Sequence, residues 1–327
     1  MKRSSSPKLT CLVALIFVTA ASCASPPRAP KAVKTVAFIT NATSDFWKIA
    51  NKGCEKADTE LADVRVVFKS TNTSAANEQN GLIRDALDMD DADAIAISVI
   101  DPASQKQLIN EAAKRTLVIT QDSDAPDTDR ALYMGADNHA AGRQAGELIK
   151  KALPQGGKIM VFVGKRDVQN ARERFDGLKE SLQGSKLEII DLLTDDADPG
   201  RARQNAYETL KKYPDIAGMV GLWSYNGPAI LQALRPEGKV GQIKIVCFDD
   251  ERATLAAIKE GAIFGTVAQQ PFEYGYQAVQ MAARILKGDR SAIPASKTIL
   301  IPTVVIQKNN VDEYTKKLNQ LLGITTG

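Results

Sequence analysis

The sequence is poor in the residues that build metal and phosphate sites. It has one histidine and four cysteines in 327 residues. His139 has no second histidine and no cysteine pair at ligand spacing to help it hold a metal, and we expect it to be structural. Neither G-x-G-x-x-G nor G-x-x-x-x-G-K-[ST] occurs, which argues against a phosphate site. We therefore expect no metal and no cofactor.

Acidic residues are missing from the start of the chain, where six basic residues precede Asp45. The whole chain has 42 Lys and Arg against 39 Asp and Glu, so the part after these six has 36 basic against 39 acidic residues. Base and acid are interspersed there, whereas a nucleic-acid-binding surface needs clustered Lys and Arg. We expect no binding to DNA or RNA. The length and the 44% hydrophobic content indicate a soluble globular protein, with two domains expected.

The N-terminal segment has the pattern of an export signal. Basic residues 2, 3 and 8 flank the start of an apolar stretch from Leu9 to Ala21, which is too short to span a bilayer. Residues 20–23 (Ala-Ala-Ser-Cys) resemble a lipobox, with Cys23 as the lipidated residue, whereas residues 22–24 (Ser-Cys-Ala) suit ordinary signal peptidase. We expect a signal peptide at 1–22, a Pro-rich tether at 23–33, and a place in the periplasm or cell envelope, lipid-anchored through Cys23.

Long hydrophobic runs are absent after this segment, where the apolar runs have the length of strands. Two cysteines, Cys54 and Cys247, remain in the folded part. Cys247 lies in an apolar strand, so two buried thiols are expected rather than a disulfide.

Short β-branched runs alternate with helical patterns along the rest of the chain. The strands start at Thr35, Val64, Ala94 and Thr116, and again at Lys158, Leu187, Ala217 and Ile243. Their spacings are 29, 30 and 22 residues in the first series and 29, 30 and 26 in the second. Such βα units form parallel sheets covered by helices on both faces. The predicted fold is α/β, with two similar doubly wound domains.

The helices between these strands follow from apolar residues at helical spacing. They are expected at 46–61, 74–87, 104–114, 138–153, 172–182, 201–212 and 226–234. A final helix, with Val311, Tyr314, Leu318, Leu321 and Leu322 on one face, is expected to dock on the surface.

Polar and aromatic residues collect just after the strands, where open α/β sheets bind ligands. They are the segment from Asn41 to Trp47, the segment from Gln121 to Asp124, Gly164 to Asp167 with Asn170 and Arg172, Trp223 to Asn226, and Phe248 to Asp250. Carboxylates, amides and a guanidinium bond hydroxyl groups, and aromatic faces cover C–H surfaces. The mixture predicts a site for a neutral polyol.

Each candidate has a purely structural alternative. Phe46 and Trp47 could anchor a helix in the core, and Trp223 could do so in its own loop. Asp122 could cap the next segment. Arg172 could be a solvated charge, which is the interpretation we favour for Glu173 and Arg174 of the same ARER motif.

Seven segments together carry a family resemblance. VAFITNATSDFWKIANKG, VITQDSDAP, GADNHAAGRQAGE, ARERFDGL, GLWSYNGPAIL, IVCFDD and GTVAQQPFEYG resemble the ribose-binding-protein-like, type 1 periplasmic sugar-binding proteins of bacterial ABC importers. The resemblance runs from about Val33 to Lys308. It implies two Rossmann-like lobes that are joined by a three-strand hinge and close over one sugar.

The resemblance also implies particular ligand-binding residues. They are Ser44, Phe46, Trp47, Asp122, Ser123, Asn138, Arg172, Trp223, Asn226, Asp249 and Gln269. Two positions depart from the family pattern. Ser123 stands where an arginine is usual, and Trp223 stands about where ribose binders have an asparagine. Asn226, in the same loop as Trp223, could supply the amide instead. The choice between pentose, hexose and cyclitol therefore stays open.

The domain boundaries follow from the same resemblance. One lobe is expected at 34–137 plus 270–297, the other at 138–269 plus 298–308, and a C-terminal helix and tail at 309–327. The expected function is capture of a monosaccharide by a monomer and its delivery to a membrane permease and ATPase.

Three other functions are compatible with parts of the sequence. A receptor could present the sugar or a furanoside signal to a chemotaxis or sensor-kinase partner. A secreted sugar-converting enzyme could use Asp122 and Asp249 as acid and base, but no sequence feature assigns them those roles, and we expect no enzyme. A repressor would need a helix-turn-helix where this chain has its export signal.

Overall fold

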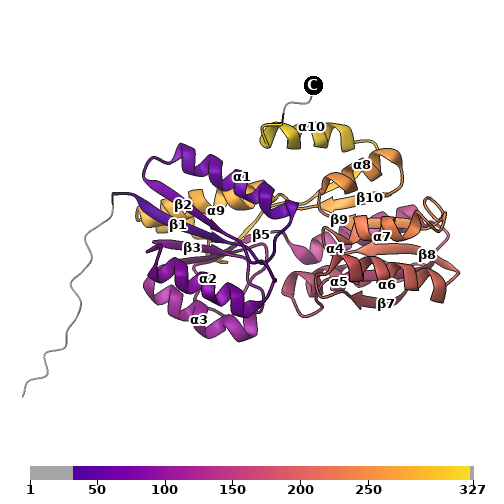
Figure 1. Cartoon of the computed structure of the whole chain (residues 1–327), viewed down its shortest axis with the longest axis horizontal. Coiled ribbons are helices and arrows are strands. Elements are labelled where there is room, and N and C mark those ends of the chain that lie inside the picture. The colour runs from indigo at the N-terminus through magenta and orange to yellow at the C-terminus, as the bar shows by residue number, and fades with distance from the viewer. Residues whose placement is uncertain (1–31, 325–327) are drawn as a thin grey trace, which may run out of the picture. The chain divides into compact units, whose positions relative to one another are not determined.

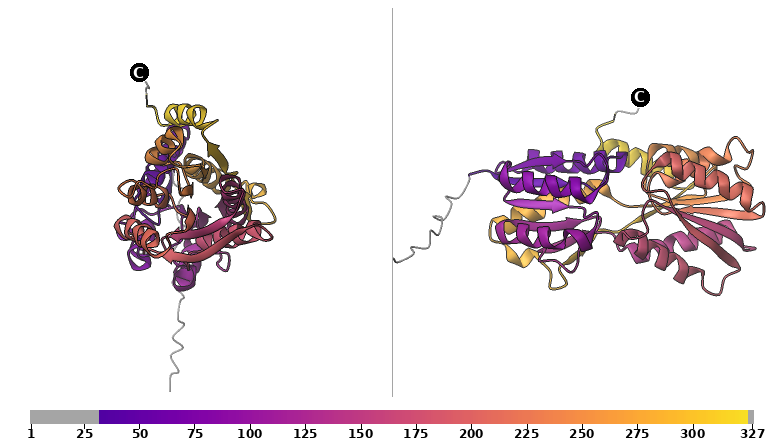
Figure 2. Two further views of the ribbon diagram at one scale, coloured as in Figure 1. Left: turned by 90° about the vertical axis from the view of Figure 1, so that its right-hand side faces the viewer. Right: turned by 60° about the horizontal axis from the view of Figure 1, so that its bottom comes forward.

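The computed structural model describes residues 32–324. They form two α/β lobes, each a six-stranded sheet with helices on both faces (Figures 1 and 2). The predicted class, two similar doubly wound lobes, is confirmed. The export signal, Cys23 and most of the tether lie outside the described residues.

The first lobe takes its elements from the N-terminal half of the chain and from a later return. They are β1 (Lys34–Ile39), α1 (Asp45–Glu60), β2 (Val64–Lys69), α2 (Ala76–Asp88), β3 (Ala94–Ile97), α3 (Pro102–Arg115), β4 (Leu117–Gln121), β5 (Leu132–Gly135), α9 (Pro271–Leu286), the 3-10 turn η1 (Arg290–Ala292) and β11 (Thr298–Leu300). The strand order is β11-β5-β4-β3-β1-β2, and all pairs are parallel.

The second lobe repeats this arrangement. Its elements are α4 (Asn138–Ala152), β6 (Gly157–Val163), α5 (Gln169–Leu182), β7 (Leu187–Thr194), α6 (Pro199–Lys212), β8 (Ile216–Gly221), α7 (Asn226–Leu234), β9 (Lys244–Phe248), α8 (Arg252–Glu260), β10 (Gly265–Ala268), β12 (Val304–Gln307) and α10 (Val311–Leu321). The order is β12-β10-β9-β8-β6-β7, with only β12 antiparallel to its neighbour in the described sheet.

All eight predicted strands and all predicted helices are present. The sequence pattern does not predict the strands β5, β10, β11 and β12, because each has only three or four residues, which is too short to show a hydrophobic period. Pro102 and Pro199 begin α3 and α6, and each follows an aspartate whose side chain caps the helix.

The chain passes between the lobes three times: after β5, after β10 and after β11. One predicted boundary is wrong at the third crossing. Residues 298–300 were assigned to the second lobe, but β11 pairs with β5 and extends the first sheet. The crossing follows β11 because the second lobe's edge strand, β12, begins only at Val304.

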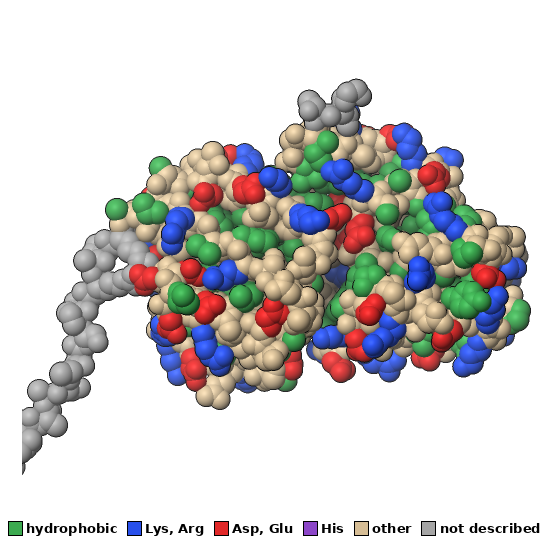
Figure 3. Space-filling model, viewed as in Figure 1, with side chains coloured by type: hydrophobic (Ala, Val, Ile, Leu, Met, Phe, Trp, Pro, Cys, Tyr) green, Lys and Arg blue, Asp and Glu red, His purple; other side chains and the backbone are tan. Residues whose placement is uncertain are grey.

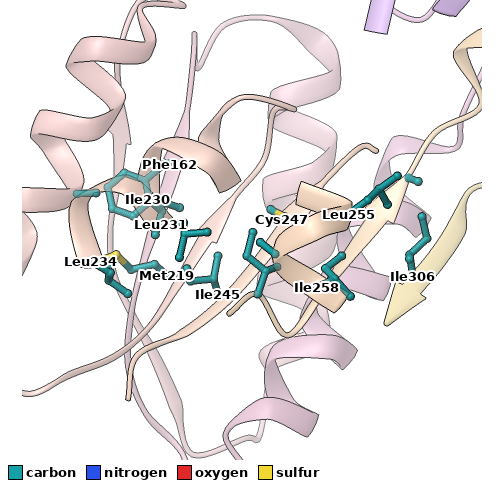
Figure 4. Packing of buried hydrophobic residues seen from close by; sticks show 14 of the residues in the cluster. Phe162, Met219, Ile230, Leu231, Leu234, Ile245, Cys247, Leu255, Ile258 and Ile306 are labelled. Carbon is teal, nitrogen blue, oxygen red and sulfur yellow. The ribbon is translucent and has the colours of Figure 1, made fainter. Parts of the chain in front are cut away.

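Alternation along the strands builds a core on each face of each sheet. In β1, Val36 and Phe38 pack with α1 and α9, whereas Ala37 and Ile39 pack with α2 and α3. The second lobe does the same with α4 and α5 on one face and α6, α7 and α8 on the other. Figure 4 shows part of this second core, including Cys247. Cys54 and Cys247 are buried free thiols, as predicted.

Glycines bring two helix pairs into backbone contact. A Cβ at Gly275 of α9 would lie 2.0 Å from the Ala50 carbonyl oxygen of α1. In the second lobe a Cβ at Gly142 of α4 would lie 2.1 Å from the Arg174 carbonyl oxygen of α5. The α4–α5 contact therefore fixes the position of Arg174.

The C-terminal helix α10 docks on the second lobe. Val311 and Leu318 are buried in that lobe's core, and Tyr314 and Leu322 pack against it. Leu321, predicted on the same face, is exposed instead. No helix within residues 32–324 is long and apolar enough to cross a membrane.

Candidate functional site

A cavity of about 550 Å³ lies between the lobes at the carboxyl ends of the strands. Its walls include the loops after β1, β4, β6, β8 and β9, which the sequence predicted, together with residues that follow β2, β3, β7 and β10. On the face seen in Figure 3 the surface is hollowed between the two lobes. Seven of the eleven predicted residues line the cavity: Ser44, Phe46, Trp47, Asp122, Trp223, Asp249 and Gln269.

An aromatic pair at the start of α1 forms part of the first-lobe wall. Phe46 and Trp47 are 7% and 4% exposed, and their rings meet edge to face at 4.9 Å. Trp47 also contacts Phe38 of β1. These side chains are thus core anchors and cavity lining at once, so the two alternatives raised by the sequence are compatible.

Asp122 sits at the end of β4 with its backbone in the left-handed region, φ 59°. Its Oδ2 accepts hydrogen bonds from Ser98 Oγ at 2.7 Å and from Asn41 Nδ2 at 3.3 Å. The Asn41 Oδ1 atom accepts in turn from Trp47 Nε1 at 3.1 Å. This chain of bonds fixes the carboxylate and the indole ring relative to one another.

Asp249 occupies the corresponding place in the second lobe, directly after β9, with φ 67°. Its Oδ1 accepts from Gln269 Nε2 at 2.9 Å and from the Gln269 backbone N–H at 3.3 Å. Gln269 belongs to the crossing between β10 and α9. The carboxylate of the second lobe is therefore bonded to the hinge.

Arg174, and not the predicted Arg172, is the arginine that lines the cavity. Arg172 is exposed, does not line the cavity and donates to the Asp167 carbonyl oxygen. Arg174 lines the cavity and is 1% exposed, with Nε donating to Asn138 Oδ1 at 3.0 Å and Nη1 to the Leu222 carbonyl oxygen at 2.8 Å. Its Nη2 has no hydrogen-bond partner within the described residues.

Helical geometry explains the correction. Arg174 follows buried Ala171 by three residues and precedes buried Leu178 by four, so all three face the lobe interior. Arg172 precedes Arg174 by two residues and so lies about 160° round the helix from it, on the solvent side. The apolar period of α5 was therefore a usable signal for Arg174.

Trp223 forms the second-lobe wall after β8. Its ring meets Tyr225 edge to face at 6.4 Å, and its Nε1 donates to Asn170 Oδ1 at 3.3 Å. Unlike Trp47, it is partly exposed. Trp223, Tyr225 and Asn170 all line the cavity.

Asn226, predicted to supply an amide to the ligand, is committed to its own loop. Its Oδ1 accepts from the Trp223 backbone N–H at 2.9 Å, and its Nδ2 donates to Asp195 Oδ2 at 3.0 Å. Tyr225 also donates to Asp195. Asn226 is fully buried and does not line the cavity, so it positions Trp223 instead.

Ser123 and Asn138 are also buried outside the cavity lining. The Ser123 Oγ has no hydrogen-bond partner in the part of the chain that the structure describes. Asn138 accepts from Arg174 and so supports that side chain. Neither residue is brought to the cavity surface as the resemblance implied.

Several lining residues were not among the predicted site residues. They include Asn41, Asn72, Ser74, Lys165, Asn170, Arg174, Ser224, Tyr225 and Glu251. Most belong to the loops singled out from the sequence, but nothing in the sequence distinguishes inward from outward side chains within a loop.

The cavity floor holds two buried carboxylates and one guanidinium. Burial raises the pKa of Asp122 to about 6 and is opposed chiefly by Arg174. Burial also raises the pKa of Asp249, again opposed chiefly by Arg174. Arg174 is thus the main positive charge that stabilises the ionised form of both carboxylates. Hydrogen bonds donated by a ligand would stabilise these ionised forms further. Within residues 32–324 no group of three or more potential metal ligands occurs.

Two lobes that enclose a polar, aromatic-walled cavity at a hinge define a two-lobed ligand-binding protein. The family model of the periplasmic binding protein domain matches residues 36–290. The chain belongs to this family, whose members in the comparisons are binding proteins rather than enzymes.

Known relatives are similar over nearly the whole folded chain. The ribose import binding protein of Salmonella typhimurium is 26% identical over 291 residues, covering 86% of this chain and 94% of the relative. A solute-binding protein of Burkholderia graminis, solved with D-arabinose, is 28% identical with a TM-score of 0.81, covering 88% of this chain and 99% of that one. A XylFII–LytSN complex contains a chain that is 28% identical with a TM-score of 0.77, covering 85% and 98%.

Proposed function

We propose that this protein captures an uncharged monosaccharide in the cavity and delivers it to an ABC permease. The observation that carries the proposal is Arg174, a buried arginine in the cavity wall near two buried carboxylates, whose Nη2 has no hydrogen-bond partner within residues 32–324. A buried donor without a partner is costly, and a ligand hydroxyl would satisfy it. The relatives' names support the choice of sugar.

The lining matches the two kinds of surface of a sugar ring. Asp122, Asp249 and Gln269 accept from or donate to hydroxyl groups, and Arg174 donates. Aromatic side chains on both walls offer apolar faces to the ring's C–H groups. An anionic sugar would meet both aspartates and gain only one arginine at the floor, so a neutral ligand fits better.

Delivery requires that a permease distinguish loaded from empty protein. A ligand held by Asp122 of one lobe and Asp249 of the other binds the closed arrangement better than an open one, and so shifts the population toward closure. We propose that the protein acts as a monomer, held at the cell envelope through a lipid on Cys23. That residue lies outside the described part of the chain.

The test is a thermal-shift screen of pentoses, hexoses, cyclitols and furanosides. A ligand that binds only the folded protein raises its apparent stability, so at least one uncharged sugar is expected to raise the unfolding temperature. Incubation with the selected sugar should leave it chemically unchanged. No shift with any sugar, or conversion of the sugar, would contradict the proposal.

A second candidate is a receptor that presents the same sugar to a signalling partner. The similarity to a chain solved in the XylFII–LytSN complex favours a protein partner of some kind, because that chain was solved with a second protein. Genes for a permease and ATPase beside this one support import, whereas a neighbouring sensor-kinase gene supports the receptor.

Sugar affinity is expected to fall as the pH drops below about 6. Burial raises the pKa of Asp122 to about 6 and also raises that of Asp249, and a hydroxyl that donates to a carboxylate favours its ionised form. Binding therefore releases protons near this pH, and affinity rises with pH until both groups are ionised. Calorimetry from about pH 5 to about pH 8 measures this, and a flat profile would contradict it.

The stability of the ligand-free protein should change in the opposite sense. The unfolded carboxyl releases its proton near 3.8, whereas folded Asp122 holds it until about 6. The folded protein thus binds more protons between these values, so the free energy of unfolding falls as pH rises through the window.

Intrinsic fluorescence should report the ligand through Trp223. The chain has two tryptophans, and both line the cavity. Trp47 is already buried without ligand, with 4% of its surface exposed, whereas Trp223 is partly open to solvent. Covering Trp223 with a sugar changes its surroundings more. Trp223→Phe is expected to remove most of the fluorescence change. A response that survives this substitution at full size would come from Trp47.

A further inference from the structure

The second crossing between the lobes carries a hydrogen-bonded chain from one lobe to the other. Tyr274 lies in the first turn of α9, in the first lobe, and is fully buried. Its hydroxyl donates to Gln269 Oε1 at 3.0 Å. The other end of the same amide, Nε2, donates to Asp249 Oδ1 in the second lobe at 2.9 Å. The amide of Gln269 is thus held from both sides of the hinge.

The ring of Tyr274 contacts the first-lobe wall of the cavity, which faces Asp249. It meets Phe46 at 6.1 Å and an interplanar angle of 65°. Phe46 lines the cavity from α1, and α1 and α9 are in backbone contact through their glycines. Tyr274 therefore touches one first-lobe lining residue with its ring and reaches a second-lobe lining residue through Gln269.

The first crossing between the lobes also makes hydrogen bonds near residues that line the cavity. The Tyr133 hydroxyl of β5 lies 3.0 Å from the Asp122 carbonyl oxygen and 3.2 Å from that of Ala136, in the crossing. Beyond it, Asn138 accepts from Arg174. The backbone at Asp122 and the side chain of Arg174 are each fixed beside this crossing.

We propose that Tyr274 is a positioning residue that sets sugar affinity by orienting Gln269 and, through it, Asp249; this rests on the proposed sugar-binding function. With the tyrosine hydroxyl on Oε1, the amide presents Nε2 to Asp249. Without it, Oε1 is a buried acceptor with no partner, and the amide can turn away from the carboxylate. The closed arrangement of the lobes, which binds the ligand, is then less stable relative to an open one.

The first test is Tyr274→Phe, which keeps the ring against Phe46 and removes only the hydroxyl. Calorimetric affinity for the sugar is expected to fall about three- to tenfold, the range for one hydrogen bond. The matched control is Tyr276→Phe on the same helix, whose hydroxyl donates to exposed Glu60 at 2.7 Å. The control should bind like the wild type, and equal affinities of all three proteins would overturn the inference.

A double-mutant cycle separates positioning from general loosening of the core. If Tyr274 acts through Gln269, then Tyr274→Phe should change affinity little in a Gln269→Ala background. Independent, additive losses would show that the tyrosine acts by another route and would overturn the proposal.

A measurement without ligand separates this inference from the proposed function. In small-angle X-ray scattering of the ligand-free protein, Tyr274→Phe is expected to increase the radius of gyration relative to Tyr276→Phe, because the hinge is less constrained. If the wild type binds no sugar, the proposed function fails and the scattering result decides the hinge role alone. Identical scattering of the two variants would contradict that role.

Discussion

Arg174→Lys is expected to weaken sugar binding by at least tenfold. The arginine donates through Nε to Asn138 and through Nη1 to the Leu222 carbonyl oxygen, and its Nη2 has no partner within residues 32–324. A lysine has one nitrogen and cannot reproduce this fork. A hydrogen bond from a charged donor contributes about 1.5 to 3 kcal/mol, which corresponds to at least a tenfold change in affinity. Calorimetry with the sugar measures the loss.

The control is Arg172→Lys, two residues away on the same helix. Arg172 is exposed and does not line the cavity, so its substitution should leave affinity unchanged. Lysine at 174 keeps a positive charge beside both aspartates, which lets the folded state tolerate the change, and thermal unfolding checks this. Wild-type affinity in Arg174→Lys, or equal losses in both variants, would show that Arg174 is not the ligand's arginine.

Gly142→Ala is expected to reduce both stability and affinity. The new methyl would lie 2.1 Å from the Arg174 carbonyl oxygen and 2.9 Å from its Cα, so α4 and α5 must separate. Overpacking of this kind costs about 1 to 3 kcal/mol of the free energy of unfolding. The same displacement moves Arg174 away from the cavity, so sugar affinity should fall several-fold. Denaturant unfolding and calorimetry measure the two effects.

Two other glycines provide controls. Gly81 lies within α2 with nothing within 4 Å of an added Cβ, so Gly81→Ala should stabilise by about 0.5 to 1 kcal/mol. Gly146 faces Ser181 in the same α4–α5 contact, two turns of α5 beyond Arg174, so Gly146→Ala should cost stability with little loss of affinity. Gly142→Ala with wild-type affinity would mean that the helix contact does not position Arg174.

The sequence was sufficient for the fold class and for the positions of two lining aspartates. Strands buried on both faces appear as continuous apolar runs, so their ends are visible. Asp122 and Asp249 each follow such a run directly, and parallel strands bring their carboxyl ends to one edge. The aromatic pair at Phe46 was placed by the same reasoning, from the first residues after β1.

The apolar period of α5 distinguishes the two arginines of one motif, because Arg174 shares a face with Ala171 and Leu178 and Arg172 does not. Which face of α5 points inward is set by the close contact of Gly142 with that helix. The interpretation of Arg174 as a solvated charge at the start of the helix is wrong, because its side chain is 1% exposed. In the structure, burial is made possible by Asn138 and by two carboxylates from distant strands.

Asn226 was misassigned for a related reason. Its amide is taken by Asp195, which follows β7 and is 31 residues away in the sequence. The partner becomes visible only when β7 and β8 flank β6 in one sheet. The third crossing was misplaced because β11 has three residues, and its pairing with β5 is a tertiary contact.

The central claim is that one sugar binds between Asp122 and Asp249, with Arg174 donating to it. A crystal structure of the protein with the sugar selected by thermal shift tests this most directly. One sugar is expected in the cavity between the lobes, in hydrogen-bond contact with both aspartates and with Arg174 Nη2. A sugar bound elsewhere, or one in the cavity that leaves Arg174 Nη2 without a partner, would contradict it.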